Sequence, residues 1–243
     1  MMANAFELPL RQGAIALGLT LSDAQIAQLL GYHALIQKWN KVYNLTAIRD
    51  PAEMLTHHLL DSLAIDAPLR IRLAALAYEQ DGASDAKTAS AESQYLYRLL
   101  DVGAGAGLPG VVVAICCPDI HVTCVDAVAK KMAFVQQAAT ELKLPNLQAL
   151  HARVETLNDT LAQKYDIITS RAFATLLDFV TGSRAALKST TGVWLAMKAK
   201  DTATEVAELP ADVAAFHVEQ LTVPGLDAER CIVWMREIHA QNA

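Results

Sequence analysis

Several features are scarce or missing in this sequence, and each absence argues against a class of protein. No run approaches the ~18 consecutive apolar residues that a membrane-spanning helix needs. The N-terminus lacks a basic segment before an apolar core, so we expect no signal peptide and a cytoplasmic location. None of the four cysteines belongs to a C-x-x-C pair, and all lie in apolar runs, which favours buried thiols over a zinc site or disulfides: Cys116, Cys117, Cys124 and Cys231.

Basic charge is scarce as well. The 243 residues include 20 Lys and Arg against 26 Asp and Glu, for a net charge of −6. Affinity for phosphate backbones comes from clustered Lys and Arg, so this balance disfavours a general polyanion-binding protein without excluding a local basic patch. Hydrophobic residues make up 53% of the chain, which is enough for a large core.

Composition divides the chain into three regions. Residues 1–77 are expected to form a helical N-terminal region, with helix starts indicated by the capping-box pattern of Ser22 and Gln25 and by Asp50 before a proline. The next residues, 78–94, are small and polar with no apolar periodicity, and they are interpreted as a flexible insertion. From residue 95 to residue 243 strand-like and helix-like runs alternate.

The alternation predicts an α/β fold. Helical stretches at 108–116, 127–142 and 174–188 separate the earlier strands, which is typical of a parallel sheet covered on both faces. The last two strands are joined by a short Pro-Gly connection and should form an antiparallel hairpin at one edge. The expected sheet is seven-stranded and mostly parallel, with strands at 95–102, 120–126, 147–152, 165–172, 192–198, 214–223 and 230–237.

A glycine-rich loop, LLDVGAGAGLPG, follows the first strand at residues 99–110. Its G-x-G-x-x-G spacing fits a dinucleotide site, with Asp126 about 20 residues further on. Two details favour a cationic cofactor without phosphate: the carboxylate of Asp101 opposes a pyrophosphate, and Pro109 removes an N–H donor from the first helical turn. S-adenosylmethionine fits both, and Asp126 would accept hydrogen bonds from its ribose. A nucleotide oxidoreductase and a purely structural role for the glycines stay open on these features.

Motifs outside this loop resemble one family closely, the bacterial RsmG (GidB) 16S rRNA guanine-N7 methyltransferases. The resemblance covers nearly the whole chain except the 78–94 insertion. It rests on W-N-K-x-x-N-L-T at 39–46, R-D-P-x-E-M at 49–54, H-x-L-D-S at 58–62, the L-P-G that ends the loop, R-V-E at 153–155, S-R-A-F-A at 170–174 and P-x-L-D-x-E-R at 224–230. It implies a Rossmann-like class I methyltransferase domain at 95–243.

The resemblance also implies a cofactor, a substrate and a mechanism. S-adenosylmethionine would be bound by residues of three loops, with Asp126 added from the ribose argument: Gly103, Gly105, Leu108, Val154, Glu155 and Arg171. The substrate would be N7 of a guanine in the decoding-region loop of 16S rRNA, in the RNA or the 30S subunit. Because N7 carries a free lone pair, we expect in-line methyl transfer with no catalytic base. Separately, we expect no metal site and a monomeric enzyme.

Four cations fall near strand ends on the expected ligand side. We expect Arg153, Lys198 and Arg230, together with Arg171, to form the local basic patch that holds RNA; ordinary surface ion pairs are the alternative. Another RNA, a small-molecule substrate or a non-catalytic ribosome-assembly role also stay open. The chain departs from the family where Ala199 replaces the usual glycine after Lys198.

Two further patterns have competing interpretations. The W-N-K-x-x-N segment beginning at Trp39 is either a packed interhelix turn or an RNA contact. Adjacent helical residues point apart, so His57 and His58 do not make a metal site; His58 is expected on the inner face of its helix, hydrogen-bonded to Asp61.

Overall fold

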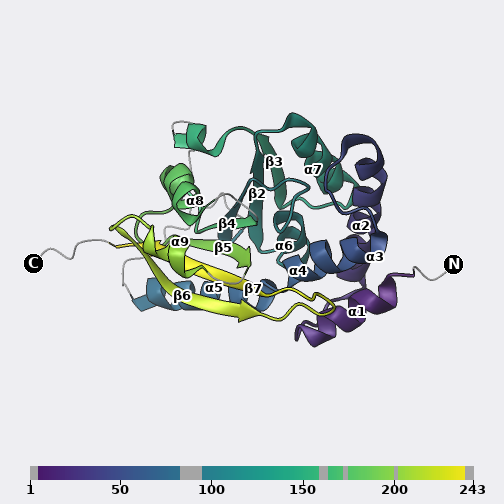
Figure 1. The fold of residues 1–243 in the computed structure, drawn as a ribbon, viewed down its shortest axis with the longest axis horizontal. Helices are drawn as coiled ribbons and strands as arrows, with labels where there is room; N and C mark the ends of the chain where they lie inside the picture. Colours follow the sequence, from purple (N-terminus) through teal and green to yellow (C-terminus); the bar gives the residue numbers. More distant parts are fainter. Residues whose placement is uncertain (1–4, 83–94, 159–163, 172–174, 200–201, 239–243) are drawn as a thin grey trace, which may run out of the picture.

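The computed structural model describes residues 5–82, 95–158, 164–171, 175–199 and 202–238. Within these residues the strands form a seven-stranded sheet in the order β3-β2-β1-β4-β5-β7-β6 (Figure 1). All neighbouring strands are parallel except for β7, which is antiparallel to both β5 and β6. The predicted sheet and edge hairpin are therefore confirmed, with strands β1 (Tyr97–Val102), β2 (Ile120–Asp126), β3 (Leu147–His151), β4 (Ile167–Arg171), β5 (Val193–Ala199), β6 (Val213–Leu221) and β7 (Arg230–Glu237).

The strands form because their apolar side chains alternate between two cores. Leu99 and Ile167 belong to the core on one face of the sheet, whereas their chain neighbours Leu100 and Ile168 belong to the core on the other face. Strands buried on both faces become nearly continuous apolar runs, as the sequence shows. All four cysteines are buried thiols, as predicted.

Helices that connect the strands cover both faces of the sheet. Helices α6 (Gly110–Cys116) and α7 (Ala129–Glu141) pack on the first core, while η2 (Val154–Asn158) and α8 (Leu176–Ser183) pack on the second. Helices α6, α7 and α8 fall within the predicted stretches at 108–116, 127–142 and 174–188, whereas η2 was not predicted; residue 174 lies outside the described residues. Two short elements follow α8, η3 (Arg184–Ala186) and α9 (Ala203–Ala207).

The N-terminal helices are part of the first core rather than a separate unit. Ser22 and Gln25 form the predicted capping box, and Asp50 caps the helix that begins at Pro51. Apolar side chains of these helices join those of α6 and α7 in one cluster. The helices are α1 (Glu7–Ala16), α2 (Asp23–Tyr43), α3 (Pro51–Met54), η1 (Leu55–Leu60), α4 (Asp61–Leu63) and α5 (Asp66–Gly82).

The expected start of the insertion at residue 78 is wrong, because helix α5 continues past it. The helix continues through Gly82, so residues 78–82 are helical, and the start expected at residue 78 falls inside it. The rest of the expected insertion, 83–94, lies outside the described residues. Among the helices that the structure describes, none is both long and apolar enough to cross a membrane.

Candidate functional site

The carboxyl ends of β1, β2 and β3 surround a first cavity of about 200 Å³, which we call the cofactor cavity. Ligands of open parallel sheets bind at this edge. Gly103 lies directly after β1 with a φ of 65°, a left-handed conformation that glycine adopts without strain. Its missing side chain leaves bare backbone at the cavity wall. The lining residues are Val102, Gly103, Val125, Asp126, Ala127, Ala152, Arg153, Val154 and Glu155.

Asp126 ends β2 and joins the glycine loop to this cavity. Its Oδ2 accepts a hydrogen bond of 3.0 Å from the N–H of Gly105, and its Oδ1 accepts one of 2.8 Å from the N–H of Val128. Lys131 lies 3.5 Å from Oδ2. A carboxylate has about four acceptor positions, so Asp126 is held in place and keeps capacity for a donor in the cavity.

The sequence predicted that Asp101 faces a cationic ligand, and this prediction is wrong. The side chain is fully buried rather than facing a cationic ligand, and its Oδ2 accepts a hydrogen bond of 2.8 Å from the N–H of Gly110 at the start of α6. Burial raises the pKa of this carboxyl to about 7, against the opposing effect of the Gly110 hydrogen bond. The side chain of Asp101 thus points from β1 into the core, where it fixes the start of α6 instead of lining the cavity.

Three expected cofactor residues, Gly105, Leu108 and Arg171, do not line the cofactor cavity. Gly105 directs its N–H at Asp126, and buried Leu108 donates its N–H to the carbonyl of Ala104. Sequence reasoning missed Tyr32 of α2, whose hydroxyl donates to the carbonyls of Ala106 and Gly107 at 2.6 and 3.2 Å. The loop is thus held by an N-terminal helix, and the apolar periodicity around Tyr32 gave no signal of it.

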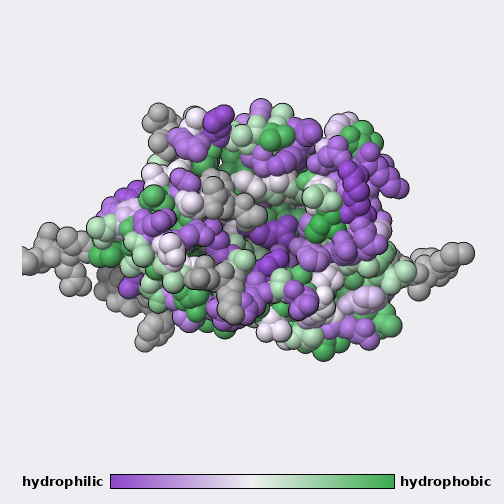
Figure 2. Space-filling view, in the orientation of Figure 1, coloured by the Kyte–Doolittle hydropathy of each residue, from purple (hydrophilic) through white to green (hydrophobic). Residues whose placement is uncertain are grey.

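A second cavity of about 380 Å³ lies at the ends of β4 and β5, and we call it the cationic cavity. It lies between the sheet and the N-terminal helices, and Figure 2 shows a hollow with hydrophilic side chains near the middle of this face. Three of the expected cations come together there, whereas Arg153 lies at the cofactor cavity. The lining residues are Ile48, His57, His58, Asp61, Arg171, Met197, Lys198, Ala199 and Arg230.

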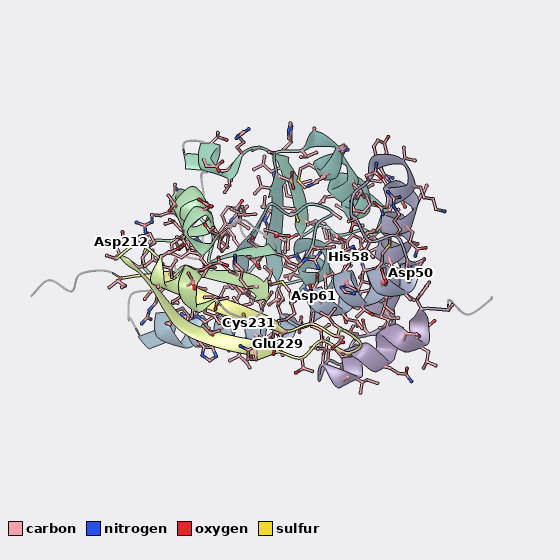
Figure 3. All side chains as sticks on the ribbon, viewed as in Figure 1. Asp50, His58, Asp61, Asp212, Glu229 and Cys231 are labelled. Carbon is pink, nitrogen blue, oxygen red and sulfur yellow. The ribbon has the colours of Figure 1, made fainter. Side chains whose placement is uncertain are left out.

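The arginines of the cationic cavity share one buried carboxylate. Arg171 Nη1 lies 3.0 Å from Asp61 Oδ2, and Arg230 Nε lies 3.1 Å from Asp61 Oδ1. Figure 3 shows Asp61 close to Glu229 and Cys231, which flank Arg230 in the chain. Asp61 is only 2% exposed, so these contacts are not ordinary surface ion pairs.

Lys198, the third cation, is paired separately. Its Nζ lies 2.7 Å from Glu205 Oε2, and the same oxygen accepts a hydrogen bond from the N–H of Leu176 at the start of α8. Ala199 ends β5 in register with Arg230 and does not have a left-handed backbone. The strand therefore continues through this position without the glycine that the family pattern usually has.

A wide helical turn presents backbone to Arg171. Residues 55–60 form a π-helix, and the backbone N–H groups at its C-terminal end donate to the carbonyls of Thr56 and His58. The carbonyl of His57 instead accepts a hydrogen bond of 2.7 Å from Arg171 Nη1. Turns of this kind recur at functional sites, and periodicity alone predicts only a continuous helix here.

The histidine expectation needs one correction. His58 is on the inner face of its helix, as expected, but its Nε2 pairs with Thr46 Oγ1 at 2.9 Å rather than with Asp61. The Asp61 carboxylate is taken by the two arginines instead. Burial, and then the charge of Arg171, lower the pKa of His58 to about 4.

The W-N-K-x-x-N segment has the contacts of a packed turn. Trp39 lies edge-on to Phe134 with ring centroids 5.4 Å apart. Buried Asn40 accepts a hydrogen bond of 2.9 Å from the N–H of Thr46 and donates one of 3.0 Å to the carbonyl of Ile48. These contacts shape the segment that leads to the cationic cavity, and they leave Lys41 exposed.

Sheet order, the reversed last strand and a cavity at the carboxyl ends of the first strands define a Rossmann-like methyltransferase fold. A crystal structure of TrmN from Thermus thermophilus supports this fold, with a TM-score of 0.50 and 18% identity over 73% of this chain and 49% of that one.

The sequence comparisons show the family. The family described as rRNA small subunit methyltransferase G (GidB) matches residues 25–69 and 81–233, and the chain belongs to it. A relative from Acidovorax sp., named "Ribosomal RNA small subunit methyltransferase G", is 61% identical over 235 residues, or 97% of both chains. A relative of the same name from Albidiferax ferrireducens is 62% identical over 231 residues, covering 95% of this chain and 97% of the relative. The resemblance found in the sequence is confirmed.

Proposed function

We propose that this protein is an S-adenosylmethionine-dependent methyltransferase that modifies N7 of one guanine in the decoding-region loop of 16S rRNA. The observation that carries the proposal is the pairing of two unlike cavities at the same edge of the sheet, one with an acidic wall and one with cations. Family membership supports the substrate class, because the relatives are named for methylation of small-subunit ribosomal RNA. We expect the enzyme to be monomeric and cytoplasmic.

The residues of the cofactor cavity fit S-adenosylmethionine better than a dinucleotide. The carboxylate of Asp126 suits the ribose hydroxyls of either cofactor, whereas that of Glu155 suits an amino donor and would oppose a phosphate. Apolar Val125, Ala152 and Val154 offer a surface for a flat purine. The volume of about 200 Å³ is below the ~300 Å³ of small ligand pockets, so we assign this cavity to the nucleoside part of the cofactor.

The remaining expected cofactor residues have separate proposed roles. Gly105 and Leu108 would act through loop shape, because the first fixes Asp126 and the second is buried. Arg171 would bridge the two sites, since it ends β4, which pairs with β1 in the sheet. Its guanidinium itself lines the cationic cavity, which favours substrate over cofactor contact.

The chemistry requires orientation rather than proton transfer. When bound, S-adenosylmethionine supplies an electrophilic methyl group on sulfur, and the N7 lone pair of guanine forms the new bond as the carbon–sulfur bond breaks. No proton leaves N7, so no general base is needed. The protein would hold N7 in line with the methyl group, and such positioning can supply roughly 7–11 kcal/mol in favourable systems.

The cationic cavity is the proposed site for the target nucleotide. Arg171 and Arg230 donate to acceptors such as phosphate oxygens and guanine O6, which leaves N7 free to react. Lys198 adds a cation at the same wall, and exposed Arg153 lies at the neighbouring cavity. Concentrated charge of this kind allows a chain with a net charge of −6 to bind RNA locally.

A labelling experiment tests the proposal. Purified protein is incubated with methyl-labelled S-adenosylmethionine and 30S subunits from a strain that lacks the activity, and the labelled base is mapped. We expect label at one guanine N7 of 16S rRNA. Label only on free oligonucleotides or metabolites would identify a different substrate. RNA binding without measurable cofactor affinity would instead identify a non-catalytic assembly protein.

A further inference from the structure

Asp61 is a buried acid at the centre of a cavity proposed to hold RNA. A buried carboxylate between two guanidiniums balances one of their two charges, so the cluster of Asp61, Arg171 and Arg230 retains a net charge of about +1. Lys198 adds no further net positive charge because it is paired with Glu205. Asp61 therefore sets how much positive charge the cationic cavity presents.

Asp61 also sets the direction of both guanidiniums. Arg171 is held through Nη1 alone, which donates to Asp61 and to the carbonyl of His57. Arg230 is held through Nε by Asp61 and through Nη1 by the carbonyl of Glu229. A guanidinium has five N–H donors, and in the described parts of the chain neither Nη2 group makes a hydrogen bond. Oriented donors therefore remain at the cavity wall.

The three side chains come from separate parts of the fold. Asp61 follows the π-helix of the N-terminal region, Arg171 ends β4, and Arg230 begins β7. Contacts over 110 and 169 positions in the sequence meet at a single carboxylate. The position of the N-terminal helices thus determines the geometry of two cations on the sheet.

We infer that Asp61 is a positioning residue for the target nucleotide. It orients the free donors of Arg171 and Arg230 toward the acceptor atoms of that nucleotide, and it removes one positive charge that would hold any RNA phosphate without selection. This inference rests on the proposed function, since it assigns the cationic cavity to RNA. Asp61 would act through these arginines, because its two carboxylate oxygens accept from Arg171 and Arg230.

A purely structural role for Asp61 predicts a different outcome from a positioning role. If Asp61 only joins α4 to the sheet, its loss lowers stability, and RNA binding falls or stays the same. If Asp61 positions and neutralises the arginines, its loss slows methylation while general RNA binding becomes stronger. Opposite movements of the two readouts therefore separate the roles.

The main test uses Asp61→Asn, with Asp66→Asn as its matched control. Asp66 is also buried, pairs through Oδ2 with Nε of Arg70 at 2.7 Å, and contacts Cys117 after α6 rather than either cavity. Both variants raise the net charge by the same amount. The readouts are the single-turnover methylation rate on undermethylated 30S subunits, cofactor affinity by calorimetry, and the salt dependence of binding to an unrelated single-stranded RNA.

For Asp61→Asn we expect methylation to slow at least tenfold and cofactor affinity to stay within twofold. The slope of log affinity against log salt should become steeper by about 0.7, the contribution of one further phosphate contact on a single strand. Asp66→Asn should match the wild type in all three readouts. Unchanged methylation in Asp61→Asn, or slower methylation with weaker RNA binding, would overturn the inference.

A second variant keeps the test decisive if Asp61→Asn does not fold. Arg230→Lys keeps the charge but loses the planar fork that bonds to Asp61 and presents other donors. We expect an unchanged salt slope, KM within about twofold and kcat lowered at least fivefold. A wild-type kcat would contradict the inference. The wild-type protein is assayed first. If it methylates no subunit, the proposed function itself is refuted, before any variant is compared.

Discussion

The two cavities lie at the same edge of one sheet and differ in charge, in the elements that build them and in how they are held. The cofactor cavity is built by β1–β3 and η2, with two acids, small apolar residues and Arg153 on its wall. Strands β4, β5 and β7 together with the N-terminal helices build the cationic cavity, where three cations and one buried acid meet. Under the proposed function, this difference would let an acidic chain separate its ligands by local charge, although its net charge says little about partners.

The largest expected effect breaks the cofactor cavity alone. In Gly103→Val a branched side chain would occupy a residue with φ of 65° at the cavity wall, where such residues are strained. We expect cofactor affinity to fall at least a hundredfold and methylation to be lost. Calorimetry with S-adenosylmethionine gives the affinity, and binding to unrelated RNA should stay within twofold because the cationic cavity is untouched.

Gly18→Val supplies the control for backbone strain. Gly18 lies between α1 and α2 with a φ of +74°, and no atom of the described residues comes within 4 Å of the place that a Cβ would take. Both variants should lose stability, but only Gly103→Val should lose cofactor affinity. Equal losses of affinity would show that strain, and not occupation of the cavity, explains the effect.

Acid titration tests the burial of His58 at the wall of the second cavity, with the charge of Arg171 as a smaller contribution. Because the pKa of His58 falls from 6.5 to about 4 on folding, protonation favours the unfolded chain. Its contribution to stability is complete above pH 6.5 and is lost as the pH falls toward 4. This pKa shift corresponds to about 3 kcal/mol of free energy of unfolding. In His58→Gln the loss of stability that comes from protonating His58 should be absent.

The measurement is urea denaturation of both proteins between pH 7 and pH 4. The wild type should be the more stable protein at pH 7, and its advantage should shrink by up to about 3 kcal/mol toward pH 4. Parallel profiles for the two proteins would show that His58 is not held in an environment that rejects its proton.

A smaller effect is expected from Asp126→Asn in the cofactor cavity. The amide keeps one acceptor, but it loses the charge and one of the two oxygens that hold the N–H groups of Gly105 and Val128. A charged acceptor for the cofactor's hydroxyls is worth about 1.5 kcal/mol, so its loss should lower cofactor affinity about tenfold. An RNA salt slope that changed as well would mean that the two cavities are not independent.

Local signals were sufficient to predict the seven strands and several of the helices. Short apolar runs mark every strand, and the caps at Ser22 and Asp50 mark two helix starts. Each of these signals lies within a few residues of the structure that it specifies. The same signals could not show the π turn at 55–60, because a wide turn and an α-helix of that length have nearly the same apolar pattern.

The candidate site was predicted less completely, because its important contacts join distant residues. Gly103, Asp126, Val154 and Glu155 meet as expected, since loops after parallel strands share one edge. The role of Asp61 could not be inferred from its motif, because its partners lie 110 and 169 residues further along the chain. Only the three-dimensional fold identifies the carboxylate that both arginines share.

Arg153 provides the smallest and most pointed test, because it is the cation expected to bind RNA that lines the cofactor cavity. Its side chain is exposed, so its charge can reach a phosphate without entering that cavity. In Arg153→Gln we expect RNA affinity to fall two- to fivefold and the salt slope to become shallower by about 0.7, with cofactor affinity within twofold. The opposite result, weaker cofactor binding with an unchanged slope, would assign Arg153 to the cofactor and make the separation of charge between the cavities less complete. Because a salt slope counts phosphate contacts, it decides between these outcomes even where the change in affinity is small.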